Sequence, residues 1–176
     1  MKVTPQLIKA FLIFPFNVMI VIPGLILWAS NQIDLLQPFH FGFDPVRGVP
    51  GGLLIAVGIV IAYSCVSLFT DHGDGTPSPW DPPKRFVVLG AYRHVRNPMM
   101  EGVFCVLLGE SLLSGSFLIF LWFLFFVVAN LLYIPLVEEP QLIARFGDSY
   151  RLYMQNVSRW LPGKHPWKGS NETEAK

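Results

Sequence analysis

Charged residues are scarce in this sequence. Of its 176 residues, 14% are Asp, Glu, Lys or Arg, whereas 52% are hydrophobic. The stretch from Ser116 to Val137 carries no charge, and the stretch from Leu7 to Ala29 carries only Lys9. A soluble domain of this length would spread its apolar residues at the period of a strand or of a surface helix. The composition therefore excludes that class and predicts an integral membrane protein.

Cysteine is nearly absent as well. Cys65 and Cys105 both lie inside apolar stretches, which excludes a disulfide scaffold and predicts small, reduced packing residues with no metal site. The net charge is +1, which gives no indication of a nucleic-acid partner.

Four apolar stretches predict membrane helices, at residues 7–29, 51–70, 99–114 and 116–137. About 20 residues cross roughly 30 Å of hydrocarbon at about 1.5 Å per residue. The third stretch is short and contains Glu101 and Glu110, so it needs support from neighbouring helices or from a tight hairpin to the fourth. We interpret the first as a retained helix, because its apolar part is too long for a signal peptide.

The distribution of Lys and Arg predicts the orientation. Two of these residues precede the first helix, Arg47 follows it, four lie between the second and third helices, and six follow the fourth. With both termini inside, twelve of the thirteen are cytoplasmic, as positive-inside bias requires.

Two further segments complete the expected organisation. The proline-rich loop from Asp71 to Arg85 should form turns and extended backbone. After Pro140, apolar residues at steps of three and four predict an amphipathic helix that lies at the cytoplasmic interface up to Pro162. We therefore predict an all-α integral membrane protein with about four transmembrane helices and a C-terminal interfacial amphipathic helix. It would form one domain over residues 1–162, with a disordered tail at 163–176.

Two segments of the sequence resemble a known superfamily. They are "GAYRHVRNPMMEG", beginning at Gly90, and "EEPQLIARFGDSYRLYMQNVSRWLP", beginning at Glu138, with an apolar hairpin between them. Together they are similar to the isoprenylcysteine carboxyl methyltransferase and phospholipid methyltransferase superfamily. Its members show a Gly-x-Tyr-x-x-x-Arg-His-Pro-x-Tyr-x-Gly element, then a Glu-Glu pair followed by Phe-Gly-x-x-Tyr-x-x-Tyr. The resemblance covers residues 84–162 and implies a membrane methyltransferase that uses S-adenosylmethionine.

The resemblance also implies which residues bind this cofactor. They lie before the first segment, within it, and at the first glutamate of the pair: Lys84, Phe86, Val87, Tyr92, Asn97, Pro98, Met99, Met100 and Glu138. A carboxylate such as Glu138 suits the ammonium and the sulfonium of the cofactor. The cofactor's α-carboxylate suits Arg96 or the N–H groups where the third helix begins. Adenine needs a flat apolar slot, which Tyr92, Phe86 and methionines can supply.

Four residues are candidates for a catalytic role. Methyl transfer is an in-line displacement, so the protein mainly positions the reactants and excludes water. An ammonium or hydroxyl acceptor also needs a base, for which His94 and Glu101 are the candidates; His94 can equally be an ordinary interfacial residue. Arg96 and Glu139 would bind the cofactor carboxylate or close the site. The alternative for the basic cluster is that its arginines anchor to lipid headgroups.

Departures from the superfamily pattern narrow the chemical class of the methyl acceptor. Asn97 and Met100 replace its His and Tyr, and Ile134 replaces an arginine that the prenylcysteine enzymes match to their substrate carboxylate. We therefore predict a lipid or lipophilic small-molecule acceptor other than a prenylcysteine carboxylate.

Glu110 leaves two interpretations open, because a carboxyl inside a membrane helix is costly unless it faces the bundle interior or is neutral. It is either a group at the acceptor site or a neutral acid hydrogen-bonded to Asn130 or Ser64. Two interpretations of the whole chain also stay open beside the methyltransferase: a membrane reductase on a related scaffold that uses a nicotinamide cofactor, and a non-catalytic membrane protein that retains the motif.

Overall fold

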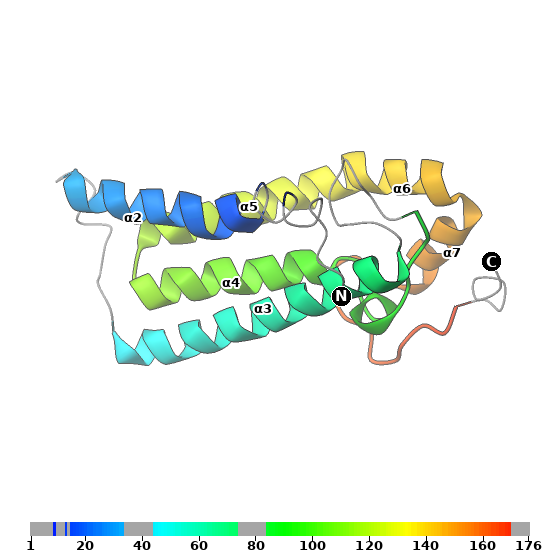
Figure 1. The fold of residues 1–176 in the computed structure, drawn as a ribbon, viewed down its shortest axis with the longest axis horizontal. Helices are drawn as coiled ribbons and strands as arrows, with labels where there is room; N and C mark the ends of the chain where they lie inside the picture. The colour runs from blue at the N-terminus through cyan, green and yellow to red at the C-terminus, as the bar shows by residue number, and fades with distance from the viewer. Residues whose placement is uncertain (1–8, 10–12, 14, 34–43, 74–83, 170–176) are drawn as a thin grey trace.

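A computed structural model describes residues 9, 13, 15–33, 44–73 and 84–169 of the chain. Every regular element in these residues is helical (Figure 1). In chain order they are η1 Asn17–Val21, α2 Ile22–Gln32, α3 Pro45–His72, η3 Gly90–Arg93, α4 Pro98–Ser114, α5 Phe117–Tyr133, η4 Ile134–Glu138, α6 Glu139–Phe146 and α7 Asp148–Asn156. The predicted start of the first helix at Leu7, the middle of the proline-rich loop and the end of the predicted tail lie outside the described residues.

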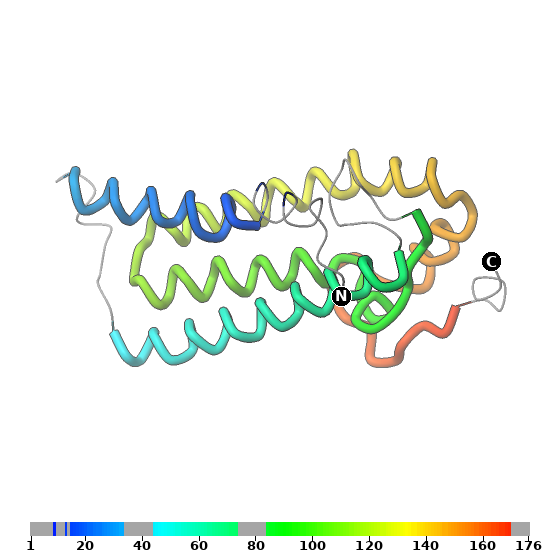
Figure 2. The backbone as a smooth tube through the Cα atoms, in the orientation of Figure 1, coloured from blue at the N-terminus to red at the C-terminus, as the bar shows by residue number. Residues whose placement is uncertain are grey.

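Helices α3 and α4 pack against each other along their length and run in opposite directions (Figure 2). Glycines make the close approach possible. A Cβ on Gly58 would lie 2.4 Å from the carbonyl oxygen of Gly102, and a Cβ on Gly51 would lie 2.8 Å from that of Gly109. These spacings agree with the close-packing role of small residues between membrane helices. They also fix the depth of every side chain on α4 relative to α3.

A tight turn joins α4 to α5. Gly115 has φ of +64°, a left-handed conformation that favours glycine, and the Ser116 hydroxyl accepts a hydrogen bond from the Ile119 N–H at the start of α5. The predicted hairpin between the third and fourth stretches is therefore present.

Two helices of the described part are long and apolar enough to cross a membrane, namely α3 and the continuous helix Phe117–Phe146. Two predicted boundaries were too narrow. Asp44 caps α3 by accepting from the Val46 N–H, so this helix begins at Pro45 rather than at residue 51.

The second boundary error concerns the fourth predicted helix, which does not stop at residue 137. A π-helical turn over Ile134–Glu138 contains Pro135 and carries the helix on into α6. A π turn accommodates the missing proline N–H without ending the helix. The predicted amphipathic helix is in turn divided, because Gly147 adopts φ of +59° between α6 and α7. The acidic pair consequently lies within a long helix and not after one.

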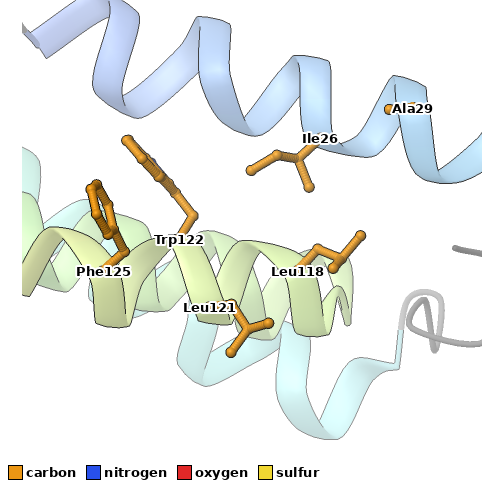
Figure 3. Close-up of a pocket in the computed structure, with 6 residues that line it drawn as sticks. All are labelled: Ile26, Ala29, Leu118, Leu121, Trp122 and Phe125. Carbon is orange, nitrogen blue, oxygen red and sulfur yellow. The ribbon is translucent and has the colours of Figure 1, made fainter.

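Helix α2 crosses alongside α5 (Figure 1). The Trp122 indole N–H donates to the carbonyl of Val18 at 3.2 Å and joins α5 to η1, which leads into α2. Near the end of the bundle that holds the α4–α5 turn, an apolar groove opens between them (Figure 3). Its lining residues are Ile26, Ala29, Leu118, Leu121, Trp122 and Phe125.

Candidate functional site

The most buried charged group described is Glu139, at the start of α6, with 3% of its surface exposed. Arg159 grips this carboxylate with two parallel bonds, from Nε to Oε1 and from Nη2 to Oε2, both at 2.8 Å. Arg96 adds a third contact, from Nη2 to Oε1 at 3.1 Å. Fork-shaped pairing of this kind is the strong geometry for guanidinium and carboxylate. The hydrogen bond to Glu139 raises the pKa of Arg159.

Arg96 connects three segments of the chain. Its side chain is 8% exposed; its Nη1 donates to the Met154 carbonyl of α7 at 3.3 Å, and its backbone N–H donates to the Ser158 carbonyl at 2.9 Å. Of the acidic pair, Arg96 thus contacts Glu139, and its predicted role in closing a site stays a prediction. The Nε–H of Arg96 is buried and has no hydrogen-bond partner among the described residues. A buried donor of this kind is costly unless a ligand completes it.

A strap formed by residues 158–167 runs along the basic segment. The Gly163 N–H donates to the His94 carbonyl at 2.8 Å, and the Trp167 N–H donates to the Arg93 carbonyl at 2.9 Å. The His94 ring meets the Gly163 carbonyl through Nδ1, also at 2.8 Å. The sequence predicts a disordered tail from Gly163, whereas in the structure Gly163 and Trp167 bond to the signature segment. The strap therefore fixes the position of the His94 ring through its Nδ1 atom.

An aromatic cluster lies beneath the strap and holds α7 in place. The rings of Phe86, Tyr150 and Tyr153 pack at 5.3 to 5.9 Å, and the Trp167 ring lies 5.6 Å from that of Tyr153. The Tyr153 hydroxyl donates to the Tyr92 carbonyl at 2.6 Å. Burial raises the pKa of Tyr153, so its phenol stays a donor to more alkaline pH than an ordinary tyrosine. Phe86 therefore has a structural role in holding α7, in addition to its predicted place in an adenine slot.

Glu138 differs sharply from its neighbour. It is half-buried, and no hydrogen bond or ion pair joins its carboxylate to any described residue. It lies within electrostatic range of the Tyr92 phenol, whose pKa is raised by burial first and by nearby groups including Glu138 second. The Tyr92 hydroxyl in turn shares a hydrogen bond with Cys65 of α3. A carboxylate is thus left unpaired beside a buried tyrosine.

The remaining predicted cofactor residues lie on both sides of the start of α4. Pro98 is fully buried in its first turn, and the Asn97 amide donates to the Arg159 carbonyl at 3.2 Å. Met99 and Met100 are half-buried, and no side chain caps the first N–H groups of the helix. Val87 is buried and Lys84 is exposed.

Taken together, these residues suit S-adenosylmethionine. The unpaired carboxylate of Glu138 suits its ammonium and sulfonium, and the free Arg96 Nε–H and the uncapped helix start suit its carboxylate. Within the described residues, no group of three or more His, Cys, Asp or Glu is arranged to bind a metal ion.

The two acids of α4 lie far apart. Glu101 is in the first turn, next to the basic segment, whereas Glu110 lies about 14 Å further along the helix axis at about 1.5 Å per residue. Each has one buried oxygen without a hydrogen-bond partner among the described residues.

The predicted bonds from Glu110 to Ser64 or Asn130 are wrong. The Ser64 hydroxyl donates to Ile61 and the Asn130 amide donates to Phe126, each within its own helix. The antiparallel register explains this result, since it sets Gly109 beside Gly51 and places Ser64 at the other end of the bundle.

Comparison with known proteins identifies the chain. The family described as phospholipid methyltransferase matches residues 46–149, which is more than half of the sequence. The chain belongs to the phospholipid methyltransferase family. The match runs from α3 through the Arg96 segment to the acidic pair and the start of α7, so it includes most of the site described above. Membership also makes the chain one of a family of membrane methyltransferases, in agreement with its apolar helices.

One curated relative within this superfamily is the protein-S-isoprenylcysteine O-methyltransferase of Schizosaccharomyces pombe. It is 34% identical over 76 residues, which is 43% of this chain and 32% of the relative. The aligned region thus spans about a third of that protein's own length. No solved structure matches this member of the phospholipid methyltransferase family significantly.

Arg159 and Tyr153 are site residues whose roles the sequence did not reveal. Both fall in the second signature segment. The Tyr92 carbonyl that Tyr153 contacts lies 61 positions earlier, beyond the α4–α5 hairpin, whereas the Glu139 partner of the Arg159 side chain lies 20 positions away. One signal could have found Arg159. Two adjacent glutamates carry two negative charges, and Arg96 supplies only one positive charge, so a second arginine could have been sought.

Proposed function

We propose that this protein transfers the methyl group of S-adenosylmethionine to a lipid or lipophilic small molecule in the membrane. The observation that carries the proposal is the contrast within the acidic pair. Glu139 is bound by two arginines, while Glu138 stands unpaired beside Tyr92. An unpaired carboxylate in a half-buried position costs free energy because it loses part of its hydration. A cationic cofactor would offset that cost by supplying a counter-charge.

The proposed cofactor site lies between the start of α4, the η4–α6 junction and the segment before η3. Glu138 would attract the cationic end of the cofactor, and Arg96 would meet its carboxylate through the free Nε–H. Tyr92, Met99 and Met100 would line the adenine side, with Lys84, Phe86, Val87, Asn97 and Pro98 as further walls. When bound, S-adenosylmethionine supplies an electrophilic methyl group on a sulfonium. Glu139 and Arg159 would act as positioning residues that fix α6 against Arg96.

The proposed membrane arrangement places this site at the cytoplasmic surface. Four antiparallel helices would cross the bilayer. They are the two longer spans, α3 and the helix that begins with α5, and the shorter helices α2 and α4. Both termini would be cytoplasmic, and α7 would lie at the interface. Residues 1–162 would form one domain. The proposed acceptor would reach the site sideways from the bilayer, while the cofactor would enter from the cytoplasm.

Calorimetry on the purified protein in detergent or nanodiscs tests the proposal directly. We expect binding of S-adenosylmethionine and of S-adenosylhomocysteine, with no heat from NADPH. Binding of NADPH alone would replace the proposal by a reductase. Binding of none of the three would leave a non-catalytic membrane protein.

A further inference from the structure

Glu101 is a carboxylate that has no role in the cofactor site proposed above. It lies in the first turn of α4, one helical turn beyond Asn97, and it is half-buried. Its Oε1 is shielded from solvent and receives no hydrogen bond from any described residue. A buried acceptor atom without a donor costs free energy, so this position favours a ligand that brings a donor of its own.

The groups around Glu101 connect it to the proposed methyl-donor site. Glu101 lies within electrostatic range of Cys65 on α3 and of Cys105 one turn further along α4. Cys65 shares a hydrogen bond with the Tyr92 hydroxyl, and Tyr92 lies within range of Glu138. Glu101 and Glu138 are therefore each within electrostatic range of one member of this pair, Glu101 of Cys65 and Glu138 of Tyr92.

Among the described residues, α4 and the part of α3 that packs against it supply no cation to a negatively charged acceptor. The sequence has no Lys or Arg from Gly48 to Gly73 or from Asn97 to Ala144. Arg159 is committed to Glu139. Arg96 reaches Glu139 and the Met154 carbonyl, and its unpartnered Nε–H is assigned above to the cofactor. A carboxylate acceptor beside Glu101 would meet a like charge in a region of low dielectric.

We propose that Glu101 is a catalytic residue that binds the acceptor and takes its proton, so that the acceptor is a lipophilic alcohol or amine and not a carboxylate. This inference rests on the proposed methyltransferase function and names its substrate class. The shared chemistry of the two acceptors is a nucleophile with an O–H or N–H proton to lose.

The proposed methyl transfer needs no reactant other than the acceptor, the methyl donor and the Glu101 carboxylate. The acceptor oxygen or nitrogen forms a bond to the methyl carbon while the bond from that carbon to sulfur breaks, and the sulfur keeps the electron pair as a neutral thioether. The proton of the acceptor passes to the Glu101 carboxylate and from there to water at the membrane surface. A positioned base of this kind typically contributes about 10²- to 10⁴-fold to the rate.

Three probes with the same farnesyl chain test the acceptor class. They are farnesol, farnesylamine and N-acetyl-S-farnesylcysteine, which end in a hydroxyl, an amine and a carboxylate. Binding is measured at pH 8 to the cofactor-free full-length protein in nanodiscs, so the reading does not depend on turnover. We expect farnesol or farnesylamine to bind at least about tenfold more tightly than the carboxylate probe. Tighter binding of the carboxylate probe, or equal binding of all three, would overturn the assignment.

A pair of variants shows whether Glu101 is responsible. Glu101→Gln should abolish the preference by removing the negative charge, while Glu110→Gln provides the matched control, because it removes the same group from the same helix about 14 Å away. Both variants should keep the affinity of the wild-type protein for S-adenosylmethionine within about twofold, which shows that they are folded. Loss of the preference in Glu110→Gln, or its persistence in Glu101→Gln, would remove Glu101 from the acceptor site.

Transfer of label from tritiated S-adenosylmethionine completes the test. The wild-type protein should label farnesol or farnesylamine, and Glu101→Gln should label either at least about 100-fold more slowly. Label in the carboxylate probe alone, or in none of the three, would overturn this inference. Binding of S-adenosylmethionine by the wild-type protein would still support the proposed function in that case, whereas absence of that binding would remove both.

Discussion

Glu138 and Glu139 follow one another on the same helix, but only Glu139 is paired. Its two oxygens accept from Arg159 at 2.8 Å each, and Arg96 approaches at 3.1 Å. Glu138 lies within electrostatic range of Tyr92, and no described residue bonds to its carboxylate. Neighbouring residues on a helix point about 100° apart, which suffices to place one carboxylate inside a structural joint and the other beside the proposed cofactor.

This difference predicts opposite outcomes for the same substitution. Glu138→Gln should abolish binding of S-adenosylmethionine in calorimetry and leave the thermal unfolding midpoint unchanged, because no contact within the protein is lost. Cofactor affinity that survived in Glu138→Gln would take this residue out of the site.

Glu139→Gln should instead destabilise the protein. Removing one partner from a buried pair leaves Arg96 without its counter-charge, which typically costs about 3–5 kcal/mol. Since Arg159 is one-third exposed and can be hydrated, we expect the lower end of that range, read as a fall in the thermal midpoint. An unchanged midpoint would mean that the three-residue joint is not a stabilising element.

Arg96 and Arg93 should respond differently to lysine. Lysine at position 96 cannot contact Glu139 and the Met154 carbonyl in the fork geometry of arginine, so Arg96→Lys should cost at least about tenfold in cofactor affinity, or about 1.4 kcal/mol. Arg93→Lys should cost little, because Arg93 contacts the Val88 carbonyl through Nε and its backbone holds the strap. Equal tolerance of both would mean that these arginines are membrane anchors.

The glycines of α3 offer a stability test with an internal control. Gly58→Ala would place a methyl group 2.4 Å from the Gly102 carbonyl oxygen, whereas Gly52→Ala would meet nothing within 4 Å. We expect Gly58→Ala to lose about 1–3 kcal/mol through forced separation of α3 and α4. Gly52→Ala should be neutral or slightly stabilising, since alanine favours helix. Comparison of the two unfolding midpoints in one detergent decides the point.

Tyr153 should make the stability of the protein depend on alkaline pH. Burial raises its pKa above the ordinary value of about 10. The stability that it contributes is therefore fully present below about pH 10 and is lost as the pH rises above that value. Tyr153→Phe should cost about 0.5–1.5 kcal/mol near pH 7, because the bond to the Tyr92 carbonyl is lost. Its thermal midpoint should then fall less steeply above pH 10, and an unchanged slope would contradict this role.

The sequence predicted the helical class and the ends of α4 well, because helix type follows from apolar runs and from a proline at a helix start. The π turn at Pro135 was missed. Proline normally signals a helix end, and only the packed structure shows that a wider turn absorbs its missing N–H.

Within the site, the sequence predicted the contact of Arg96 with the acidic pair, since the topology brings both to one end of the bundle. Which glutamate Arg96 contacts could not be read from the sequence. That outcome depends on the rotation of α6 after the π turn and on Arg159, which competes for the same carboxylate.

The strap has a consequence for biogenesis. Gly163 and His94 are 69 positions apart in the chain, and both α4 and α5 lie between them. The ribosome therefore synthesises the whole hairpin before the strap can close over His94, because the chain emerges from the N-terminus onwards. The joint at Glu139 needs Arg159 as well as Arg96, so it also cannot be completed before the hairpin has been synthesised. Binding of the proposed cofactor would thus report, in a cell-free translation reaction, the moment at which this joint has closed.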